Sequence, residues 1–364
     1  MNKILEIKNL TIQFATRDGA FKAVDNVSFD IEKNQTVALV GESGSGKSVT
    51  AMSILQLLPR PQASYSLGSS IKFNNSEIID ASKEKLLSIR GNIVSMIFQE
   101  PMTSLNPYHK VGDQITESIL LHSNSTKKEA TKEAMDLMSL VEIDDVNRRF
   151  YSYPHELSGG QRQRIMIAMA LVNKPELLIA DEPTTALDVT IQAQILDLMS
   201  KLKNELGMSI LFITHDLGLV KQFSDQVCVM KDGEIVEKGN TNNVFSDPSH
   251  VYTKKLLDAE PLPKISNALQ TVPVIEIKNL NVFYNIPSPN FFKRNTFHAV
   301  KDISFSIFEN TTIGLVGESG SGKSTLGKAI ANLVDYEGNI LFKGKNLNTN
   351  SKKENKELKK NVQI

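Results

Sequence analysis

Two glycine-rich loops carry the residue types that hold phosphate. The sequence Gly-Glu-Ser-Gly-Ser-Gly-Lys-Ser occurs at Gly41–Ser48 and again at Gly317–Ser324. In such a loop, successive backbone N–H groups curl around the β-phosphate, the lysine reaches the β and γ oxygens, and the last serine offers a hydroxyl to Mg²⁺. We therefore expect ATP and Mg²⁺ at the first loop, and phosphate binding at the second loop if that part of the chain folds. The residues expected to bind the nucleotide are Gly41, Ser43, Gly44, Gly46, Lys47 and Ser48, and in the second loop Gly317, Gly320, Gly322, Lys323 and Ser324.

A pair of carboxylates follows the apolar run Leu177–Ala180. The run reads as a buried strand, and Asp181 and Glu182 stand at its carboxyl end, which is the ligand edge of a parallel sheet. We expect Asp181 to coordinate Mg²⁺ with Ser48, and Glu182 to polarise the attacking water as the general base. Considered alone, an acidic pair after an apolar strand could equally belong to an ordinary turn.

Two further polar residues follow runs that are expected to be strands. Gln99 comes after Ser95–Phe98, and His215 comes after Ser209–Thr214. We expect the Gln99 amide to touch Mg²⁺ or water, and the His215 imidazole to hold the γ-phosphate. A lone glutamine or histidine is otherwise a structural hydrogen-bonding residue. The surrounding motifs favour the roles at the nucleotide.

The segment Leu157-Ser158-Gly159-Gly160-Gln161 lies between the first phosphate loop and the carboxylate pair. Ser158 is placed to cap a helix over 159–172, whose N–H groups and positive dipole end would face an anion. Gly159 and Gly160 are poor helix formers, and they permit close backbone approach to a phosphate. We expect Ser158, Gly159, Gly160 and Gln161 to contact nucleotide, although helix capping alone explains part of the pattern.

An aromatic residue ends the alternating run Ile4–Phe14. Phe14 is a candidate for stacking on adenine, with Tyr284 as its counterpart in the repeated segment. The alternative is that Phe14 belongs to the core, as aromatic residues in strands commonly do.

The elements that must position these residues form an α/β pattern. Parallel strands are expected to end at Val40, Asp181 and Thr214, with helices between them. The segment 4–31 is expected to be antiparallel, 110–140 a helical subdomain, and Asp232-Gly233 a hairpin turn between two strands.

An internal repeat sets the domain organisation. Leu5–Leu10 returns as Ile275–Leu280, and Ala23–Phe29 returns as Ala299–Phe305. We expect one complete unit over 1–260, a linker over 261–272 and the N-terminal part of a second unit over 273–364. In the second copy a strand over 313–316 is expected to precede the phosphate loop. The copy stops short of a counterpart of Gln99, so we expect it to be truncated.

Composition narrows the function classes. The chain has 364 residues, and its 41 Lys plus Arg balance its 41 Asp plus Glu, which gives no general attraction for nucleic acid or an anionic membrane. The one cysteine, Cys228, is expected in a buried strand and cannot form a disulfide framework, so a reducing cytoplasmic setting is expected. No run approaches the roughly 18 apolar residues of a membrane span, and the N-terminus does not resemble a signal peptide.

These motifs together resemble the ABC ATPases, and the first copy is similar to the ATP-binding subunits of oligopeptide and dipeptide importers. The segments that carry the finer resemblance are Gln99–Pro107, Tyr153–Leu157 and His250–Leu257. Val251 stands where that subgroup usually has proline. Two cassettes in one chain resemble the peptide, microcin C or glutathione importer ATPases. No iron–sulfur cluster is expected, because the cysteines that hold it in some relatives are missing.

The resemblance implies a P-loop ABC cassette that hydrolyses ATP at the cytoplasmic face of the inner membrane. It implies two permease subunits as partners, an extracytoplasmic solute-binding protein as an indirect one, and a second cassette, in the same or another chain, that closes over the ATP. It also adds Asp188, at the end of Pro183–Asp188, to the nucleotide site.

Three other readings stay open. A catalytically incomplete ATP-binding fragment would keep the phosphate loop without turnover. A non-transport ABC ATPase would act on ribosomes or DNA, although the long coiled coils, zinc cysteines or basic linkers typical of nucleic-acid binding are not visible, and no nucleic-acid partner is expected. A small-molecule kinase would use Lys47 and Asp181 but would leave Ser158 and His215 without a role.

Overall fold

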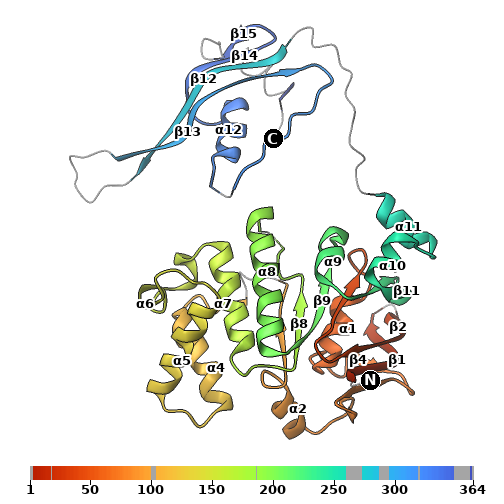
Figure 1. Cartoon of the computed structure of the whole chain (residues 1–364). Coiled ribbons are helices and arrows are strands. Elements are labelled where there is room, and N and C mark those ends of the chain that lie inside the picture. The colour runs from red at the N-terminus through yellow and green to blue at the C-terminus, as the bar shows by residue number, and fades with distance from the viewer. Residues whose placement is uncertain are drawn as a thin grey trace. The chain divides into compact units, whose positions relative to one another are not determined.

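The computed structural model describes residues 3–17, 19–99, 104–185, 187–259, 273–286, 295–318, 320–347 and 361–362. The chain divides into two compact units, Met1–Glu260 and Pro261–Ile364 (Figure 1). The linker expected over 261–272 lies outside the described residues, as do 100–103 of the importer-like segment that follows Gln99.

A largely parallel sheet forms the centre of the first unit. In its described part six strands run in the order β11-β10-β3-β9-β8-β7, and all neighbours are parallel except β10 and β11. The strands are β3 (Thr36–Val40), β7 (Val94–Ile97), β8 (Leu177–Asp181), β9 (Ser209–Thr214), β10 (Gln226–Lys231) and β11 (Glu234–Asn240). Because β3, β7, β8 and β9 point the same way, their carboxyl ends meet at one edge of the sheet.

Alternating residues of the central strands enter two different cores. Val37 and Leu39 pack in one hydrophobic cluster, whereas Ala38 and Val40 pack in the other. This follows from the two-residue period of a strand, whose successive side chains point to opposite faces. Each buried Val or Leu contributes about 1.5–3 kcal/mol of transfer free energy, so β3 is held firmly from both sides.

An antiparallel sheet lies at the N-terminal end of the unit, as the sequence predicted. Strand β1 pairs with both β2 and β5, with β4 alongside and β6 at the edge. Its strands are β1 (Lys3–Thr16), β2 (Gly19–Glu32), β4 (Ala63–Tyr65), β5 (Ser70–Phe73) and β6 (Ser76–Glu77). The hairpin expected at Asp232-Gly233 joins β10 and β11, and Cys228 is buried in β10.

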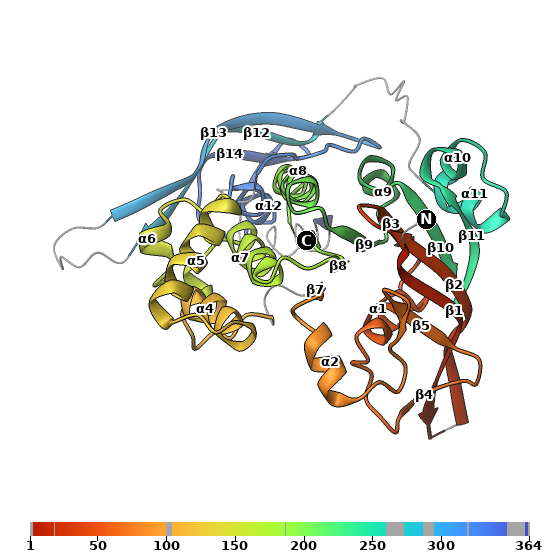
Figure 2. The ribbon, with the colours of Figure 1, turned by 60° about the horizontal axis from the view of Figure 1, so that its bottom comes forward.

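Helices cover the sheets and build a separate subdomain. Figures 1 and 2 show α4, α5, α6 and α7 gathered on the side of the unit away from β1 and β2. The helices are α1 (Lys47–Ile54), α2 (Lys83–Ile89), α4 (Val111–His122), α5 (Lys127–Leu140), α6 (Val146–Arg149), α7 (Gly159–Leu171), α8 (Val189–Leu206), α9 (Leu217–Phe223), α10 (Thr241–Ser246) and α11 (Val251–Asp258), with a 3₁₀ turn at Pro154–Glu156. Within the described ranges, no helix combines the length and apolarity that crossing a membrane requires.

The second unit repeats the beginning of the first. A long antiparallel pair leads into the order β13-β12-β14-β15, and one helix follows the phosphate loop. The elements are β12 (Pro273–Ile286), β13 (Asn295–Phe308), α12 (Lys323–Ile330), β14 (Glu337–Phe342) and β15 (Lys345–Asn346).

The strand expected over 313–316 is not formed, so that prediction was wrong. Residues 311–318 have no strand pairing, and Leu315 and Val316 are 49% and 94% exposed. In the first unit the equivalent β3 is hydrogen-bonded between β9 and β10. The described residues of the second unit contain no strand that pairs with this segment, and an apolar run without hydrogen-bonded neighbours has no ladder to join.

Candidate functional site

The first phosphate loop connects the end of β3 to the start of α1. Gly46 has a φ of 100°, and a Cβ there would lie 2.6 Å from the carbonyl oxygen of Ala23, so only glycine fits. The Lys47 ammonium group donates hydrogen bonds to the carbonyl oxygens of Gly41 and Glu42, both at 2.8 Å. The loop therefore holds a cation among backbone groups at the N-terminus of a helix, which is the arrangement that phosphate binding needs.

Burial and nearby carboxylates act against each other on Lys47. The side chain is only 6% exposed, and burial lowers the pKa of its ammonium group, while the charges of Glu182 and Asp181 raise it. The two carboxylates therefore favour the charged form of this buried lysine, which is the form that binds phosphate oxygens.

Asp181 ends β8 with one oxygen atom that lacks a partner. The residue is 4% exposed, and its Oδ1 makes no hydrogen bond within the described part of the chain. Burial raises the pKa of the carboxyl, and a hydrogen bond from Ser48 lowers it in part. A buried carboxylate oxygen beside a serine hydroxyl fits a hard divalent cation such as Mg²⁺, which prefers oxygen ligands. The described residues contain no group of three or more His, Cys, Asp or Glu that could hold a metal by itself.

Glu182 is held by three side chains, one from its own turn and two from other parts of the chain. Its carboxylate lies 2.9 Å from Nδ1 of His215 and accepts hydrogen bonds from the Gln99 amide at 2.9 Å and the Thr185 hydroxyl at 3.0 Å. Burial alone would raise the pKa of Glu182, but the hydrogen bonds from His215, Thr185 and Gln99 outweigh it and lower the pKa. The carboxylate is therefore ionised at neutral pH.

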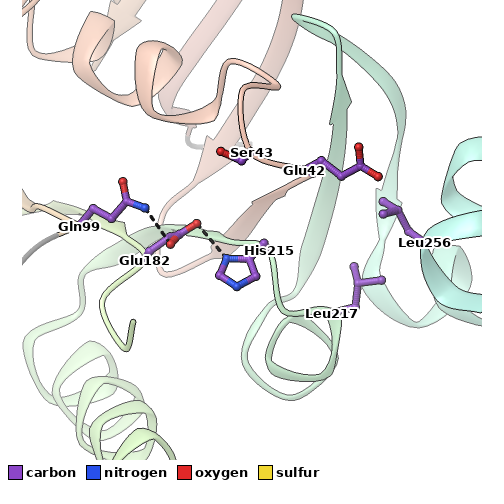
Figure 3. Close-up of a pocket in the computed structure, with 8 residues that line it drawn as sticks. Glu42, Ser43, Gln99, Glu182, His215, Leu217 and Leu256 are labelled. Carbon is purple, nitrogen blue, oxygen red and sulfur yellow. Dashed lines mark hydrogen bonds and ion pairs between the residues drawn. The ribbon is translucent and has the colours of Figure 1, made fainter. Parts of the chain in front are cut away.

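The backbone of Glu182 is also unusual. Its φ of 47° is in the left-handed region, which costs a non-glycine residue about 1–3 kcal/mol. Its N–H donates to the carbonyl oxygen of Ile213 at 2.9 Å, which fixes this turn against β9. The strained turn directs the side chain toward Gln99 and His215, as Figure 3 shows.

A cavity of about 500 Å³ brings these groups together. The phosphate loop lies on one side of it, the Glu182 cluster on another, and two leucines close a third (Figure 3). The lining residues are Gly41, Glu42, Ser43, Gln99, Glu182, His215, Leu217 and Leu256. Residues far apart in the sequence thus converge at the carboxyl edge of the sheet.

The Ser158 segment forms a reciprocal helix cap. The Ser158 hydroxyl accepts from the N–H of Gln161, and the Gln161 side chain accepts from the N–H of Ser158, both at 3.2 Å. Ser158 and Gly159 are exposed, whereas a Cβ on Gly160 would lie 2.9 Å from Ile191. Capping and packing explain Ser158, Gln161 and Gly160 in part. The exposed N-terminus of α7 stays available to an anion.

Two predicted nucleotide residues have other partners in the described unit. Phe14 packs at the edge of the hydrophobic core, opposite Phe21 and Ala63 of neighbouring strands. Asp188 caps α8 by accepting from the N–H of Ile191 at 3.0 Å. Neither residue lines the cavity beside the phosphate loop. Their roles at a nucleotide stay predictions.

The second phosphate loop repeats the local geometry of the first. Lys323 donates to the carbonyl oxygens of Gly317 and Glu318, both at 2.6 Å, and Gly322 has a φ of 93°. Gly320 has a φ of 82°, and Ser324 is exposed. The loop is therefore shaped for phosphate, although the described residues of this unit supply no acidic pair beside it.

Sequence reasoning missed four residues at or next to the site. The Thr185 hydroxyl bonds to Glu182, and Tyr252 accepts a hydrogen bond from the N–H of Glu42 at 3.3 Å. Leu217 and Leu256 line the cavity. A threonine three residues after a carboxylate was a usable signal. The others act through contacts between distant segments and had no local signature.

Known sequences place these features in a family. A family model described as ABC transporter matches residues 24–185 and 300–364. The chain is 49% identical over 365 residues to the peptidoglycan transport ATP-binding protein YejF of Agrobacterium fabrum (strain C58 / ATCC 33970). It is 44% identical over 369 residues to an uncharacterized ABC transporter ATP-binding protein, YejF of Escherichia coli (strain K12). It is 42% identical over 395 residues to the glutathione import ATP-binding protein GsiA of the same strain.

These alignments cover nearly all of this chain but only part of each relative. They take in 99% of the chain in each case, and 66%, 68% and 63% of the three relatives. The chain thus spans about two thirds of the length of the curated relatives that it matches.

Solved structures agree on the fold. The chain is similar to the dimeric ATP-binding cassette MJ0796 in a post-hydrolysis state bound to ADP and Pi, with a TM-score of 0.58 and 28% identity. The similarity covers 65% of this chain and 98% of that one. It is also similar to cbiO1 of Clostridium perfringens, with the same TM-score and identity, over 68% of this chain and 92% of that one. The fold expected from the sequence is confirmed.

Proposed function

Because this chain belongs to the ABC transporter family of ATP-binding proteins, we propose that it binds and hydrolyses ATP to drive an importer for peptides or related small solutes. The observation that carries this proposal is the cavity in which Gly41, Glu42 and Ser43 of the phosphate loop meet the Glu182 cluster. A base held beside a phosphate-binding loop is what phosphoryl transfer to water requires.

In this proposal the phosphate loop and Lys47 bind the β- and γ-phosphates, and Glu182 accepts a proton from the attacking water. The lowered pKa of Glu182 keeps it ionised for that step. His215 contacts Glu182 through Nδ1, so it can also donate to a γ-phosphate oxygen only as an imidazolium, with one N–H for each partner. Gln99, bonded to Glu182, orients the base and the water beside it.

The metal fits the oxygen atoms present at the site. Asp181, whose Oδ1 has no hydrogen-bond partner among the described residues, and Ser48, which hydrogen-bonds to the same carboxyl, would hold Mg²⁺, and Gln99 stands as the third candidate. Bound there, Mg²⁺ neutralises charge that develops on the phosphate oxygens. We further propose that Phe14 stacks on adenine and that Asp188 belongs to the nucleotide site.

Closure over the nucleotide would come from a second cassette. The exposed α7 N-terminus at Ser158, Gly159, Gly160 and Gln161 would face the γ-phosphate of an ATP held by another cassette, in the same or another chain. The second phosphate loop, with Lys323 in the same geometry as Lys47, would hold a second ATP. Two permease subunits at the cytoplasmic face of the inner membrane, fed by an extracytoplasmic binding protein, would convert closure into transport.

The substrate class rests on the named relatives. One is described as a peptidoglycan transport protein and another as a glutathione importer. Both solutes contain peptide bonds, which favours peptides or peptide-containing small molecules for this chain. The permease and the binding protein would choose among them.

The test is the dependence of ATP hydrolysis on a partner. Phosphate release by the full chain should rise when it is reconstituted in lipid with the permease subunits from the same gene neighbourhood. Stimulation by ribosomes or RNA instead would support a non-transport ATPase, and a phosphorylated small molecule formed one for one with ADP would support a kinase. ATP binding without phosphate release under all these conditions would indicate a fragment without turnover.

A further inference from the structure

The helix α11 is fastened to the edge of the central sheet by one carboxylate. Glu237 of β11 accepts hydrogen bonds from the N–H of Ser249 at 2.7 Å and the N–H of His250 at 3.0 Å. His250 then caps the helix by accepting from the N–H of Tyr252 at 3.2 Å. These contacts fix the start of α11, and with it the direction of the side chains one turn further on.

Tyr252 uses this fixed position to contact the phosphate loop. Its side chain is buried, and its hydroxyl oxygen accepts the N–H of Glu42 at 3.3 Å. The Lys231 ammonium group lies over the same ring, 5.3 Å from its centre, which also holds the ring in place. One turn later, Leu256 lines the cavity beside Glu42 and Ser43.

The part of the loop that α11 supports is the part that faces the reacting end of the nucleotide. Gly41, Glu42 and Ser43 line the same cavity as Glu182 and His215. The other half of the loop is held differently, since Gly46 packs against the backbone of Ala23 and Lys47 begins α1. Lys47 also holds the carbonyl oxygens of Gly41 and Glu42 from within the loop, and α11 adds a support from outside the loop through the N–H of Glu42.

We infer that Tyr252 is a positioning residue that holds Glu42 and Ser43 in place for the γ-phosphate, so that the site binds a nucleoside triphosphate more tightly than a diphosphate. This inference rests on the proposed ATP binding at the first loop. The Tyr252 hydroxyl accepts the N–H of Glu42 and thereby satisfies it. This N–H then does not turn to another acceptor when a ligand enters the cavity. A diphosphate lacks the γ-phosphate and contacts less of the loop at Glu42 and Ser43. Its binding therefore depends less on Tyr252.

The experiment measures the affinities of Mg-ATPγS and Mg-ADP for the first loop of the full chain carrying Lys323→Ala, which weakens binding at the second loop. In that background Tyr252→Phe deletes only the hydroxyl and keeps the ring. Val251→Ala is the matched control, because Val251 lies on the same helix and is 78% exposed. We expect Tyr252→Phe to weaken ATPγS binding about five-fold, the worth of one neutral hydrogen bond, and ADP binding less than about two-fold.

The outcomes separate this inference from the function on which it rests. If the background protein binds neither nucleotide, ATP binding at the first loop fails, and the inference fails with it. If it binds both, and Tyr252→Phe weakens both equally or neither, the proposed function stands and Tyr252 has only a structural role. A loss confined to ATPγS, with Val251→Ala unchanged, supports the assignment.

Discussion

The two phosphate loops of this chain have the same sequence and nearly the same backbone, but they stand in different surroundings. Gly44 and Gly320 have φ values of 83° and 82°, and the two lysines donate to equivalent pairs of carbonyl oxygens. The strand before the first loop is fully buried, whereas the segment before the second has no strand pairing and is largely exposed. The loop therefore forms from its own residues, and the strand before it does not.

The different surroundings of the two loops also separate nucleotide binding from nucleotide hydrolysis. A glycine loop with a lysine at a helix N-terminus suffices to attract phosphate. In the proposed mechanism hydrolysis needs Asp181, Glu182 and His215, which stand at or just after the ends of two further strands. In the described residues only the first unit assembles these ends around its loop. We therefore expect the first unit to hydrolyse ATP, and the second loop to bind phosphate without hydrolysing ATP.

The largest expected effect tests this division. Glu182→Gln keeps the size and shape of the side chain but replaces one accepting oxygen with an amide and removes the base, so phosphate release should fall about 1,000-fold while ATP remains bound. Release is measured at saturating ATP, and binding by equilibrium methods. The matched control is Glu176→Gln, an exposed glutamate just before the other end of β8, whose carboxylate accepts from Asn74. Unchanged hydrolysis in Glu182→Gln would remove the general base from the first unit and erase the contrast between the units.

A pair of equivalent leucines tests the packing side of the comparison. Leu39 and Leu315 stand two residues before their phosphate loops, yet Leu39 is fully buried and Leu315 is 49% exposed. Leu39→Ala should lower the free energy of unfolding of the first unit by about 2–5 kcal/mol, because it leaves a cavity in a closed core. Leu315→Ala should lower the free energy of unfolding of the second unit by less than about 1 kcal/mol. Chemical unfolding of the full chain measures both. An equal loss at Leu315 would mean that this segment is packed in solution like β3.

The sequence predicted most of what local rules determine. The strands that end at Val40, Asp181 and Thr214, the Ser158 cap and the Asp232-Gly233 hairpin follow from periodicity, capping and turn chemistry, and the structure confirms them. The strand over 313–316 was predicted from the same kind of apolar run and is absent, since strand formation depends on neighbours that a local pattern does not contain.

The fine structure of the site was harder to predict. The motifs placed Gln99, Glu182 and His215 at one edge of the sheet. That Glu182 would adopt a left-handed backbone and gather Gln99, His215 and Thr185 on one carboxylate depends on the turn after β8 packing against β9. Tyr252 reaches Glu42 from a helix about 210 residues later in the chain, and no spacing rule covers such a contact.

The two loop lysines give a direct comparison of the binding sites. Lys47→Ala should weaken ATP binding at the first loop about 30-fold, because a charge-assisted hydrogen bond to phosphate contributes about 2 kcal/mol. Lys323→Ala should weaken binding at the second loop by a smaller factor, since Lys323 is less buried than Lys47 and solvent screens its charge more. Calorimetric titration of each variant against wild type measures the affinity of the mutated loop beside the unchanged one. A larger loss from Lys323→Ala would show that Lys323 contributes more to ATP binding than Lys47 and would reverse the comparison.

The smallest expected effect concerns the helix α11, a support that no described element of the second unit gives to its loop. The hydrogen bonds to Glu237 outweigh the effect of burial and lower its pKa from 4.5 to about 2. A carboxylate with a lowered pKa stabilises the folded state above its unfolded pKa, and that stabilisation is lost as the pH falls from 4.5 toward 2.

Glu237→Gln should therefore lower the free energy of unfolding by about 1 kcal/mol at pH 7, after allowance for solvent screening. The difference in free energy of unfolding between Glu237→Gln and wild type, measured by urea unfolding, should decrease from pH 5 to pH 3. Glu234→Gln, on an exposed residue of the same strand, is the control and should show no such pH dependence. A gap for Glu237→Gln that stays constant over this range would mean that the carboxylate's charge does not hold α11, and that the support of the first loop comes from packing alone.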